Sequence, residues 1–466
     1  MLWSAPSQYG FLSILLPALL PIKSAWNAFY VFQAIALFGA AALFYRTLNR
    51  CLGMSSVLAL VLVIASFFLA DPALIGPSSF PSSSAMRFVW CYALLAIGAA
   101  RFLGERPSMR SFVRRATLPW VLGVLWSAES ALYVTATLFT PVAVHGLIVL
   151  MSGTNLKRVL SDTAALVLYP LVWLGAVLVV IALVYAIGLG HLPDISMYFQ
   201  YAVAYAAGFG ALPLVRDGPI WVFALILIAG VISLALGLKR TFTIEGPAGA
   251  AIVAMGCIWS VTSYYVGRAV PTNVIALLPV LCFALAIIVR SGVRMGAVSR
   301  LQTAVSIPFF GLVFASAFWQ PDLPAVLARL RPYPQDQVAV LPQADAELEQ
   351  LLSTAGVSPR SHVTYYGYAA SMPTTGGARP ESFERTWING PPQLLEEPIS
   401  AERRALVFGR FAERRHEGGY FVQKRGEAED RVEDWLRLIE TSYRVRATFS
   451  SDHYRVILFE PDAQRH

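Results

Sequence analysis

The sequence predicts a polytopic α-helical membrane protein with a C-terminal soluble α/β domain. Of the 466 residues, 56% are hydrophobic and only 14% are charged, a balance that excludes an ordinary soluble enzyme. The charge also changes along the chain. Residues 1–321 hold 18 Lys/Arg and 7 Asp/Glu, whereas residues 322–466 hold 18 and 21. We therefore expect a transmembrane domain over 1–321 and a water-soluble domain over 322–466.

About ten transmembrane helices are expected from the apolar runs, several of which approach the ~20 residues needed to cross a bilayer. The runs lie near 25–45, 54–70, 86–103, 115–128, 130–150, 163–188, 219–238, 247–266, 271–289 and 303–319. Lys and Arg in the loops orient them, because cytoplasmic loops are enriched in positive charge. Alternate loops hold fourteen Lys/Arg on one side and four on the other. This asymmetry predicts that the C-terminal domain faces outside, on a bacterial inner (plasma) membrane.

The N-terminal segment shows no cleavable signal peptide, since it lacks a basic n-region. The apolar run Phe11–Ile22 contains Pro17 and Pro21 and is too short to span. It is typical of an interfacial or re-entrant helix. A polytopic chain that starts outside is unusual, so we expect an upstream helix and loop to be missing.

The soluble part has the pattern of a small α/β domain, with β-branched and aromatic runs typical of strands. Strands are expected at Val338–Leu341, His362–Tyr366, Tyr420–Gln423, Tyr443–Phe449 and Tyr454–Phe459. Helices are expected at Ala344–Ala355, Ala401–Arg415 and Glu427–Thr441, and a loop at Met372–Pro398. The four cysteines lie in or beside the membrane runs, so the domain has no internal disulfide. No metal-ligand or nucleophile motif appears in it.

The outer loops of the membrane domain carry few charges, and these form the candidate site. Arg268 lies in the stretch Ser263–Pro279, between two apolar runs, and a cation there is costly unless it is paired or faces water. Glu129 lies in WSAES (Trp126–Ser130), where the chain must turn back and expose it outside. The alternative is a Glu129 that is protonated or paired inside the bundle. We expect Glu129 and Arg268 to share one outer cavity, since burying either alone is expensive.

The outer loop Gly188–Pro219 contains the aromatic stretch Met197–Phe209, which is typical of an amphipathic helix on the outer surface. Its tyrosines fit equally a simple interfacial anchor. Asp71 begins another outer segment, Asp71–Met86, which ends just before Arg87.

Arginines and carboxylates above a membrane suit transfer from a lipid-linked phosphate. An arginine can grip a phosphate with two donors and stays charged when desolvated. A carboxylate can act as the general base on an acceptor hydroxyl. The same charges fit helix–helix ion pairs equally well when each is taken alone.

Four segments resemble the GT-C superfamily of membrane glycosyltransferases that use polyprenyl-phosphate sugars. They are QYGFLSILLPALLP (Gln8–Pro21), FPSSSAMR (Phe80–Arg87), WSAES, and YYVGRAVPTN (Tyr264–Asn273). The resemblance implies a GT-C-like bundle with an extracytoplasmic α/β domain after the last helix. It implies a polyprenyl-phosphate-linked sugar as donor and a cell-envelope glycan, lipid or protein as acceptor, among membrane lipids and without nucleic acid. No cofactor is identified, and a requirement for a divalent cation stays open.

The resemblance also assigns candidate roles to residues. Asp71 and Glu129 are the catalytic candidates, and Arg87 and Arg268 are ligands for the phosphate or sugar. Tyr265 and Asn273 are the further substrate-binding candidates. In this superfamily the principal catalytic carboxylate lies in the first outer loop, so we expect it upstream of Met1 and expect the present chain to be truncated and inactive.

Three other classes compete with this interpretation. Another lipid-linked transferase or ligase would use the same charges. A transporter would need broken helices and a polar site at the membrane midplane, whereas the charges here follow one face. A non-catalytic scaffold carrying an exported sensor domain would not need arginines in hydrophobic outer loops.

Overall fold

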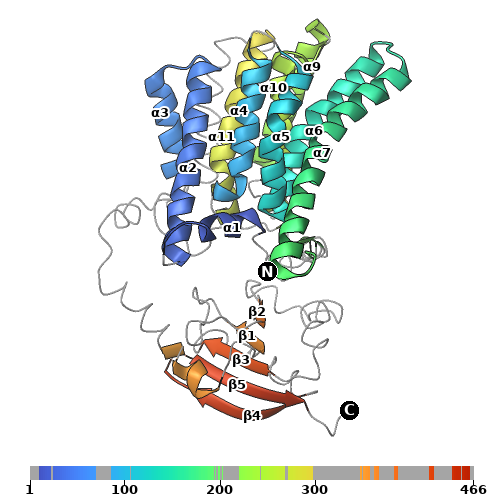
Figure 1. The fold of residues 1–466 in the computed structure, drawn as a ribbon. Coiled ribbons are helices and arrows are strands. Elements are labelled where there is room, and N and C mark those ends of the chain that lie inside the picture. The colour runs from blue at the N-terminus through green and yellow to red at the C-terminus, as the bar shows by residue number, and fades with distance from the viewer. Residues whose placement is uncertain are drawn as a thin grey trace. The chain divides into compact units, whose positions relative to one another are not determined.

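The computed structural model shows a helical N-terminal part and a C-terminal sheet (Figure 1). It describes residues 10–22, 25–69, 85–104, 107–193, 220–241, 243–267, 271–296, 350–356 and five C-terminal strands, with a few further single positions. The chain divides into two compact units, Met1–Val326 and Leu327–His466. Each unit is described by itself.

The first unit is a bundle of helices that run alternately up and down (Figure 1). Its helices are α1 (Leu12–Ala18), α2 (Ala25–Arg50), α3 (Ser56–Ile64), η1 (Ala65–Leu69), η4 (Ala85–Phe88), α4 (Val89–Phe102), α5 (Met109–Trp126), α6 (Ala128–Met151), α7 (Leu156–Leu189), α9 (Ile220–Thr241), α10 (Pro247–Gly267) and α11 (Pro271–Arg294). The short helix α1 lies across the others rather than along them (Figure 1). That arrangement agrees with the interfacial or re-entrant helix expected over Phe11–Ile22.

Five helices are long and apolar enough to cross a membrane among the residues that the structure describes: Ala28–Arg50, Ala128–Met151, Leu156–Gly188, Pro247–Gly267 and Ala276–Arg294. They are consistent with a multi-pass membrane protein. Ten crossings are not confirmed. Helix α4 has only 14 residues, and α5 carries three arginines in its first two turns. The run expected at 303–319 lies outside the described residues.

Helix α10 forms the centre of the bundle, and α7 lies at its edge. In the apolar stretch of each helix, 72% of the residues of α10 are buried, compared with 6% of those of α7. Small residues allow the close approach of neighbouring helices to α10. A Cβ added at Gly98 of α4 would lie 2.9 Å from Val253 Cγ1, and one added at Gly256 would lie 2.9 Å from Thr140 Cβ of α6.

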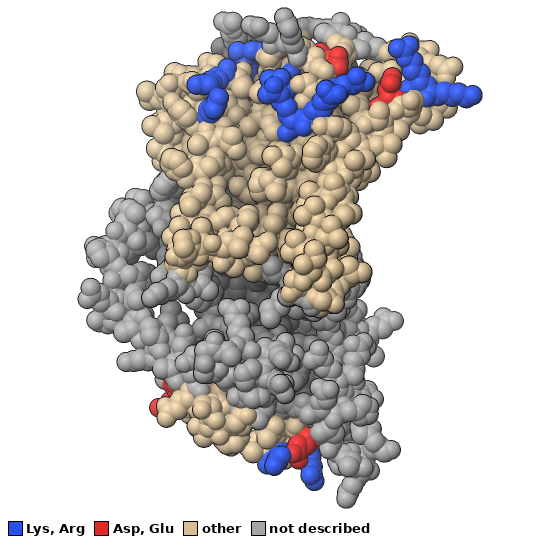
Figure 2. Space-filling view, in the orientation of Figure 1, with Lys and Arg blue, Asp and Glu red and all other residues tan. Residues whose placement is uncertain are grey.

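Positive charge gathers at one end of the bundle (Figure 2). Arg46, Arg50, Arg101, Arg110, Arg114, Arg115, Lys157, Arg158, Arg290 and Arg294 lie at this basic end, as the helix directions require. At the opposite end, the described Lys, Arg, Asp and Glu residues are Arg87 and Glu129 alone. The alternation that the loop charges predict is thus present in the helix directions. The side of the membrane that each end faces stays a prediction.

The second unit contains a five-stranded mixed sheet with the order β2-β1-β3-β5-β4. Its strands are β1 (His362–Tyr366), β2 (Ser382–Thr386), β3 (Gly419–Lys424), β4 (Tyr443–Ser450) and β5 (Tyr454–Pro461). Strand β1 pairs in parallel with β2 and β3, and β5 pairs antiparallel with β3 and β4. Its described core includes the buried side chains of Val456 and Phe459 on β5.

The predicted strands at His362–Tyr366, Tyr420–Gln423, Tyr443–Phe449 and Tyr454–Phe459 correspond to β1, β3, β4 and β5. The loop predicted over Met372–Pro398 is wrong in part, because β2 lies within it. The sequence Ser382–Thr386 has little strand propensity, and it is a strand because it pairs with β1 at the edge of the sheet. Positions 350–354 are helical within the helix expected at Ala344–Ala355. The strand expected at Val338–Leu341 and the helices expected at Ala401–Arg415 and Glu427–Thr441 lie outside the described residues.

Candidate functional site

The turn between α5 and α6 organises the end of the bundle that carries Arg87 and Glu129. Ser127 is the single residue between the two helices, in an extended conformation. Its hydroxyl accepts a hydrogen bond from the Ser130 backbone N–H at 3.1 Å, which caps α6. The turn predicted at Ser127–Ser130 is therefore present. It places Glu129 in the first turn of α6, where the helix dipole stabilises a carboxylate.

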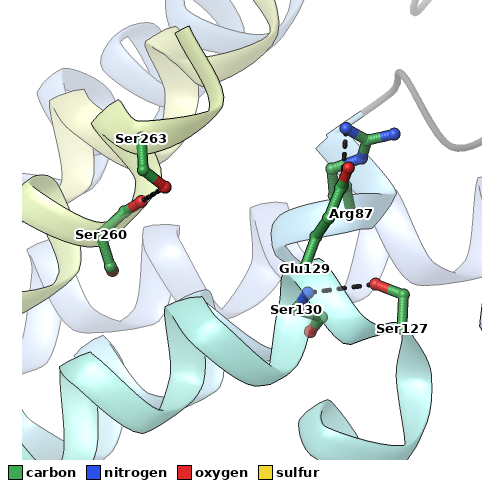
Figure 3. A network of polar contacts seen from close by, with 6 residues as sticks. All are labelled: Arg87, Ser127, Glu129, Ser130, Ser260 and Ser263. Atoms are coloured by element: carbon green, nitrogen blue, oxygen red, sulfur yellow. Dashed lines mark hydrogen bonds and ion pairs between the residues drawn. The ribbon is translucent and has the colours of Figure 1, made fainter. Parts of the chain in front are cut away.

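Arg87 and Glu129 form a close ion pair across two separate elements (Figure 3). Arg87 Nη1 lies 2.7 Å from Glu129 Oε2. The Arg87 side chain is 8% exposed and that of Glu129 is 25% exposed. Arg87 comes from η4, immediately before α4, and so approaches the start of α6 from the side. The structure shows Glu129 paired, as in the alternative interpretation, but at the end of the bundle at the predicted turn rather than inside it; the side of the membrane that this end faces stays a prediction.

The Tyr264 ring lies against the guanidinium, and two further rings pack in contact with Tyr264 or its neighbour Phe88. Arg87 Cζ lies 4.5 Å from the centroid of the Tyr264 ring, a cation–π contact with α10. The Phe88 ring meets Tyr264 edge-on with centroids 5.9 Å apart, and it lies 5.4 Å from the ring of Tyr133 on α6. The Tyr264 ring covers one face of the guanidinium, and the Arg87 side chain is buried.

Two serines of α10, drawn in Figure 3, make hydrogen bonds within α10 and to α6. The Ser263 hydroxyl donates to the Ser260 carbonyl at 2.5 Å. The Ser260 hydroxyl lies 3.3 Å from the Tyr133 carbonyl of α6. This contact holds the end of α10, and with it Tyr264, at a fixed position relative to Glu129.

Two segments that are distant in the sequence donate hydrogen bonds to carbonyls in the last turn of α5. The Phe11 N–H donates to the Trp126 carbonyl at 3.1 Å, and the Tyr198 hydroxyl donates to the Val124 carbonyl. Gly10 makes the first contact possible. Its φ is +90°, and a Cβ there would lie 2.0 Å from the Trp126 oxygen. Tyr198 is 6% exposed, and this burial raises the pKa of its phenol. These bonds satisfy carbonyls that a helix end would otherwise leave open.

The structure brings two of the six predicted site residues, Arg87 and Glu129, into contact. Tyr265 is 1% exposed and its ring lies 5.8 Å from that of Phe223, away from the pair. Asn273 is in the first turn of α11, and its side chain is not described. Asp71 and Arg268 lie outside the described residues, so the shared cavity of Glu129 and Arg268 stays a prediction. Most of the expected helix Met197–Phe209 also lies outside them, except Tyr198, Phe199 and Ala202.

Tyr264 is the site residue that the sequence prediction did not choose. It lies four residues after Ser260 and therefore on the same face of α10, the face that contacts α6. Choosing between Tyr264 and Tyr265 requires knowing which face of α10 meets α6. Because α10 is apolar around most of its circumference, its sequence has no strong periodicity from which that face can be read.

The chemistry of the described site is that of one guanidinium, one carboxylate and one phenol. Within the described ranges, no group of three or more His, Cys, Asp or Glu is placed to hold a metal ion. The guanidinium can bind an anion with its fork, and the carboxylate can accept a proton.

Comparisons of the chain with protein-family models, with curated proteins and with solved structures find no match. The class of this protein is therefore defined by its fold and its site alone. The class is a helical protein with several apolar helices able to span a membrane and an ion pair at the less charged end of its bundle.

Proposed function

We propose that the protein is an integral membrane glycosyltransferase that moves a sugar from a polyprenyl-phosphate donor to an acceptor on the outer face of the membrane. One observation carries the proposal: the ion pair of Arg87 with Glu129 at the end of the bundle opposite the basic end. The resemblance of the Arg87 and Glu129 segments to the GT-C superfamily supports the same conclusion.

The ion pair suits this reaction because its two partners match the two demands of glycosyl transfer. An oxygen of the acceptor forms a bond to the anomeric carbon, and the bond from that carbon to the phosphate oxygen breaks. The phosphate leaves with its negative charge, which an arginine stabilises. The acceptor hydroxyl gives its proton to a carboxylate. Arg87 would serve the phosphate, and Glu129, with Asp71, would serve the acceptor.

Tyr264 and the position of Arg87 add a physical reason for phosphate binding. Arg87 lies in η4 at the start of α4, at the end of the apolar helices and therefore near the depth of a lipid phosphate. The Tyr264 ring covers one face of the Arg87 guanidinium. The N–H groups at the edge of the guanidinium stay in position to donate hydrogen bonds to a phosphate. A phosphate that binds there would compete with Glu129 for Arg87 and free the carboxylate to accept a proton.

The test is a transfer assay on the protein expressed from its native gene, with a synthetic polyprenyl-phosphate sugar as donor and cell-envelope extract as acceptor. Arg87→Ala is expected to lower the rate by about 10²–10³, the usual cost of one such contact. Arg87→Lys is expected to recover only part of it, because lysine lacks the bidentate geometry. Arg158→Ala at the basic end is the matched control. Folded Arg87 variants with wild-type rates would show that the pair is only structural.

The location of the C-terminal unit is part of the same proposal. Residues 322–466 face the periplasm or cell exterior if the basic end of the bundle, where α11 ends, is cytoplasmic and the run 303–319 crosses the membrane once more. Fusion of alkaline phosphatase to the C-terminus should give phosphatase activity, and fusion of a reporter that folds only in the cytoplasm should stay dark. A bright cytoplasmic reporter without phosphatase activity would overturn this orientation.

A further inference from the structure

Arginines from three helices converge on the turn between α2 and α3, at the basic end of the bundle. Arg46 and Arg50 lie in the last turns of α2, Arg101 in the last turn of α4, and Arg294 at the end of α11. The three helices end side by side. The Arg294 guanidinium donates to the Leu103 carbonyl just after α4, which ties the ends of α11 and α4 together.

The turn itself, Cys51–Ser55, is well defined and brings a fifth arginine close. The Asn49 amide donates to the Met54 carbonyl at 3.2 Å and to the Ser56 hydroxyl at 3.0 Å. Gly53 has a φ of +69°, and a Cβ there would lie 3.5 Å from Arg290 Nη2. The backbone of the turn thus faces Arg290, and Gly53 is exposed.

Among the described residues, the positive charge of Arg46, Arg50, Arg101 and Arg294 exceeds the negative charge placed at this turn. Helix C-termini contribute roughly half a negative charge each, so three ends offset fewer than two of these four arginines. Burial raises the pKa of the Cys51 thiol, and Arg294, Arg46, Arg101 and Arg50 all act to lower it.

The described carboxylates of the basic end are engaged elsewhere. A Glu245 oxygen accepts from the Met109 N–H at 3.0 Å, and Asp162 lies 4.0 Å from Arg158. The turn is therefore a concentration of like charges that an external anion would stabilise.

We propose that this turn, with Arg46, Arg50, Arg101, Arg290 and Arg294, binds the phosphate headgroup of an anionic phospholipid. Basic clusters where transmembrane helices leave the bilayer attract such headgroups. Apolar side chains beside the turn provide the contact for the acyl chains. Leu43 of α2, Val57 and Leu58 of α3 are 37%, 74% and 48% exposed. A soluble phosphate would gain nothing from these apolar surfaces, so the occupant is a lipid.

The test is native mass spectrometry of the full chain in mild detergent, titrated with phosphatidylglycerol or phosphatidylcholine. Wild-type protein is expected to retain phosphatidylglycerol in preference. Arg46→Gln/Arg50→Gln should weaken that retention on the order of tenfold, since each basic residue near a headgroup contributes measurably to binding. Arg114→Gln/Arg115→Gln removes the same charge from exposed positions at the start of α5 and should change retention less than about threefold.

Two outcomes would overturn the proposal. Equal losses in the two double variants would show general attraction between a basic end and an anionic lipid. Displacement of bound phosphatidylglycerol from wild-type protein by millimolar inorganic phosphate would show a soluble anion site. Both results can be obtained on folded protein. If Arg46→Gln/Arg50→Gln does not fold, Arg46→Lys/Arg50→Lys replaces it, because it keeps the charge. That variant should still retain less phosphatidylglycerol than wild type, because lysine lacks the forked guanidinium of arginine.

Discussion

The two ends of the helical bundle use charge in different ways, and their two ion pairs show the difference. At the basic end Arg158 and Asp162 lie 4.0 Å apart on the surface of α7, with 79% and 68% of their side chains exposed. At the other end Arg87 and Glu129 lie 2.7 Å apart and are 8% and 25% exposed. The first pair joins neighbouring turns of one helix. The second joins residues 42 positions apart in the sequence, and the Tyr264 ring lies against its guanidinium.

Exposure decides what each pair does for the protein. A solvated pair contributes little to stability, because water screens it and two long side chains must be held in place. A largely buried pair contributes through the cost of removing one partner, which leaves an uncompensated charge. A buried pair is also where an external ligand can gain most by taking over one partner. The proposed transfer reaction therefore places the donor phosphate at the Arg87 end.

Arg87→Ala is expected to have the largest effect on stability. It removes the guanidinium that pairs with Glu129, at a cost of about 2–4 kcal/mol. The cost is below that of a fully buried pair, because Glu129 is a quarter exposed. Thermal unfolding in one detergent at a fixed scan rate measures it. Arg158→Ala should cost less than about 0.5 kcal/mol. Equal shifts in melting temperature for the two variants would remove the distinction between the pairs.

Replacing a packed and an open glycine by alanine should shift the stability in opposite directions. A Cβ at Gly123 of α5 would lie 2.6 Å from Val134 Cγ1 and 3.2 Å from Trp90 Cβ, so Gly123→Ala should destabilise by about 1–3 kcal/mol. A Cβ at Gly39 of α2 meets nothing within 4 Å. Gly39→Ala should therefore raise stability by about 0.5–1 kcal/mol through helix propensity. A destabilised Gly39→Ala together with a tolerated Gly123→Ala would contradict the packing of α4, α5 and α6 that supports the site.

Within the candidate site, a smaller loss of stability is expected at Tyr264 than at Arg87. Tyr264→Leu removes the ring against Arg87 and should cost about 0.5–2 kcal/mol, whereas Tyr264→Phe keeps the ring and should cost less. In the transfer assay the same order is expected. If Tyr264→Phe is as damaging as Tyr264→Leu, the phenol hydroxyl rather than the ring matters, and the cation–π contact is not what positions Arg87.

Local patterns in the sequence predict most of the fold. Helices occupy nine of the ten predicted apolar runs, and the alternation of charged loops predicts the helix directions. The number of crossings is harder to predict, because an apolar run does not say whether its helix spans, as the short α4 shows. Strand β2 illustrates the same limit in the second unit, since pairing with β1 rather than its own sequence makes it a strand.

The candidate site is predictable in part. Isolated charges between apolar runs single out Arg87 and Glu129, because a membrane protein retains such charges only where they are paired or used. Their contact with each other is a matter of tertiary structure, as η4 reaches the start of α6 from another part of the chain. The same is true of Tyr264, and of the hydrogen bonds by which Phe11 and Tyr198 close the end of α5.

The most direct test of the central claim is the binding of a polyprenyl phosphate to the Arg87 end. A short-chain polyprenyl phosphate should raise the melting temperature of the wild-type protein, since a ligand that binds the folded state stabilises it. In Arg46→Gln/Arg50→Gln, which weakens the anionic-lipid site at the α2–α3 turn, the rise that remains should come from the Arg87 end, and adding Arg87→Gln to that variant should abolish it. An equal rise in that variant with and without Arg87→Gln would contradict the assignment of the phosphate site to the ion pair of Arg87 and Glu129.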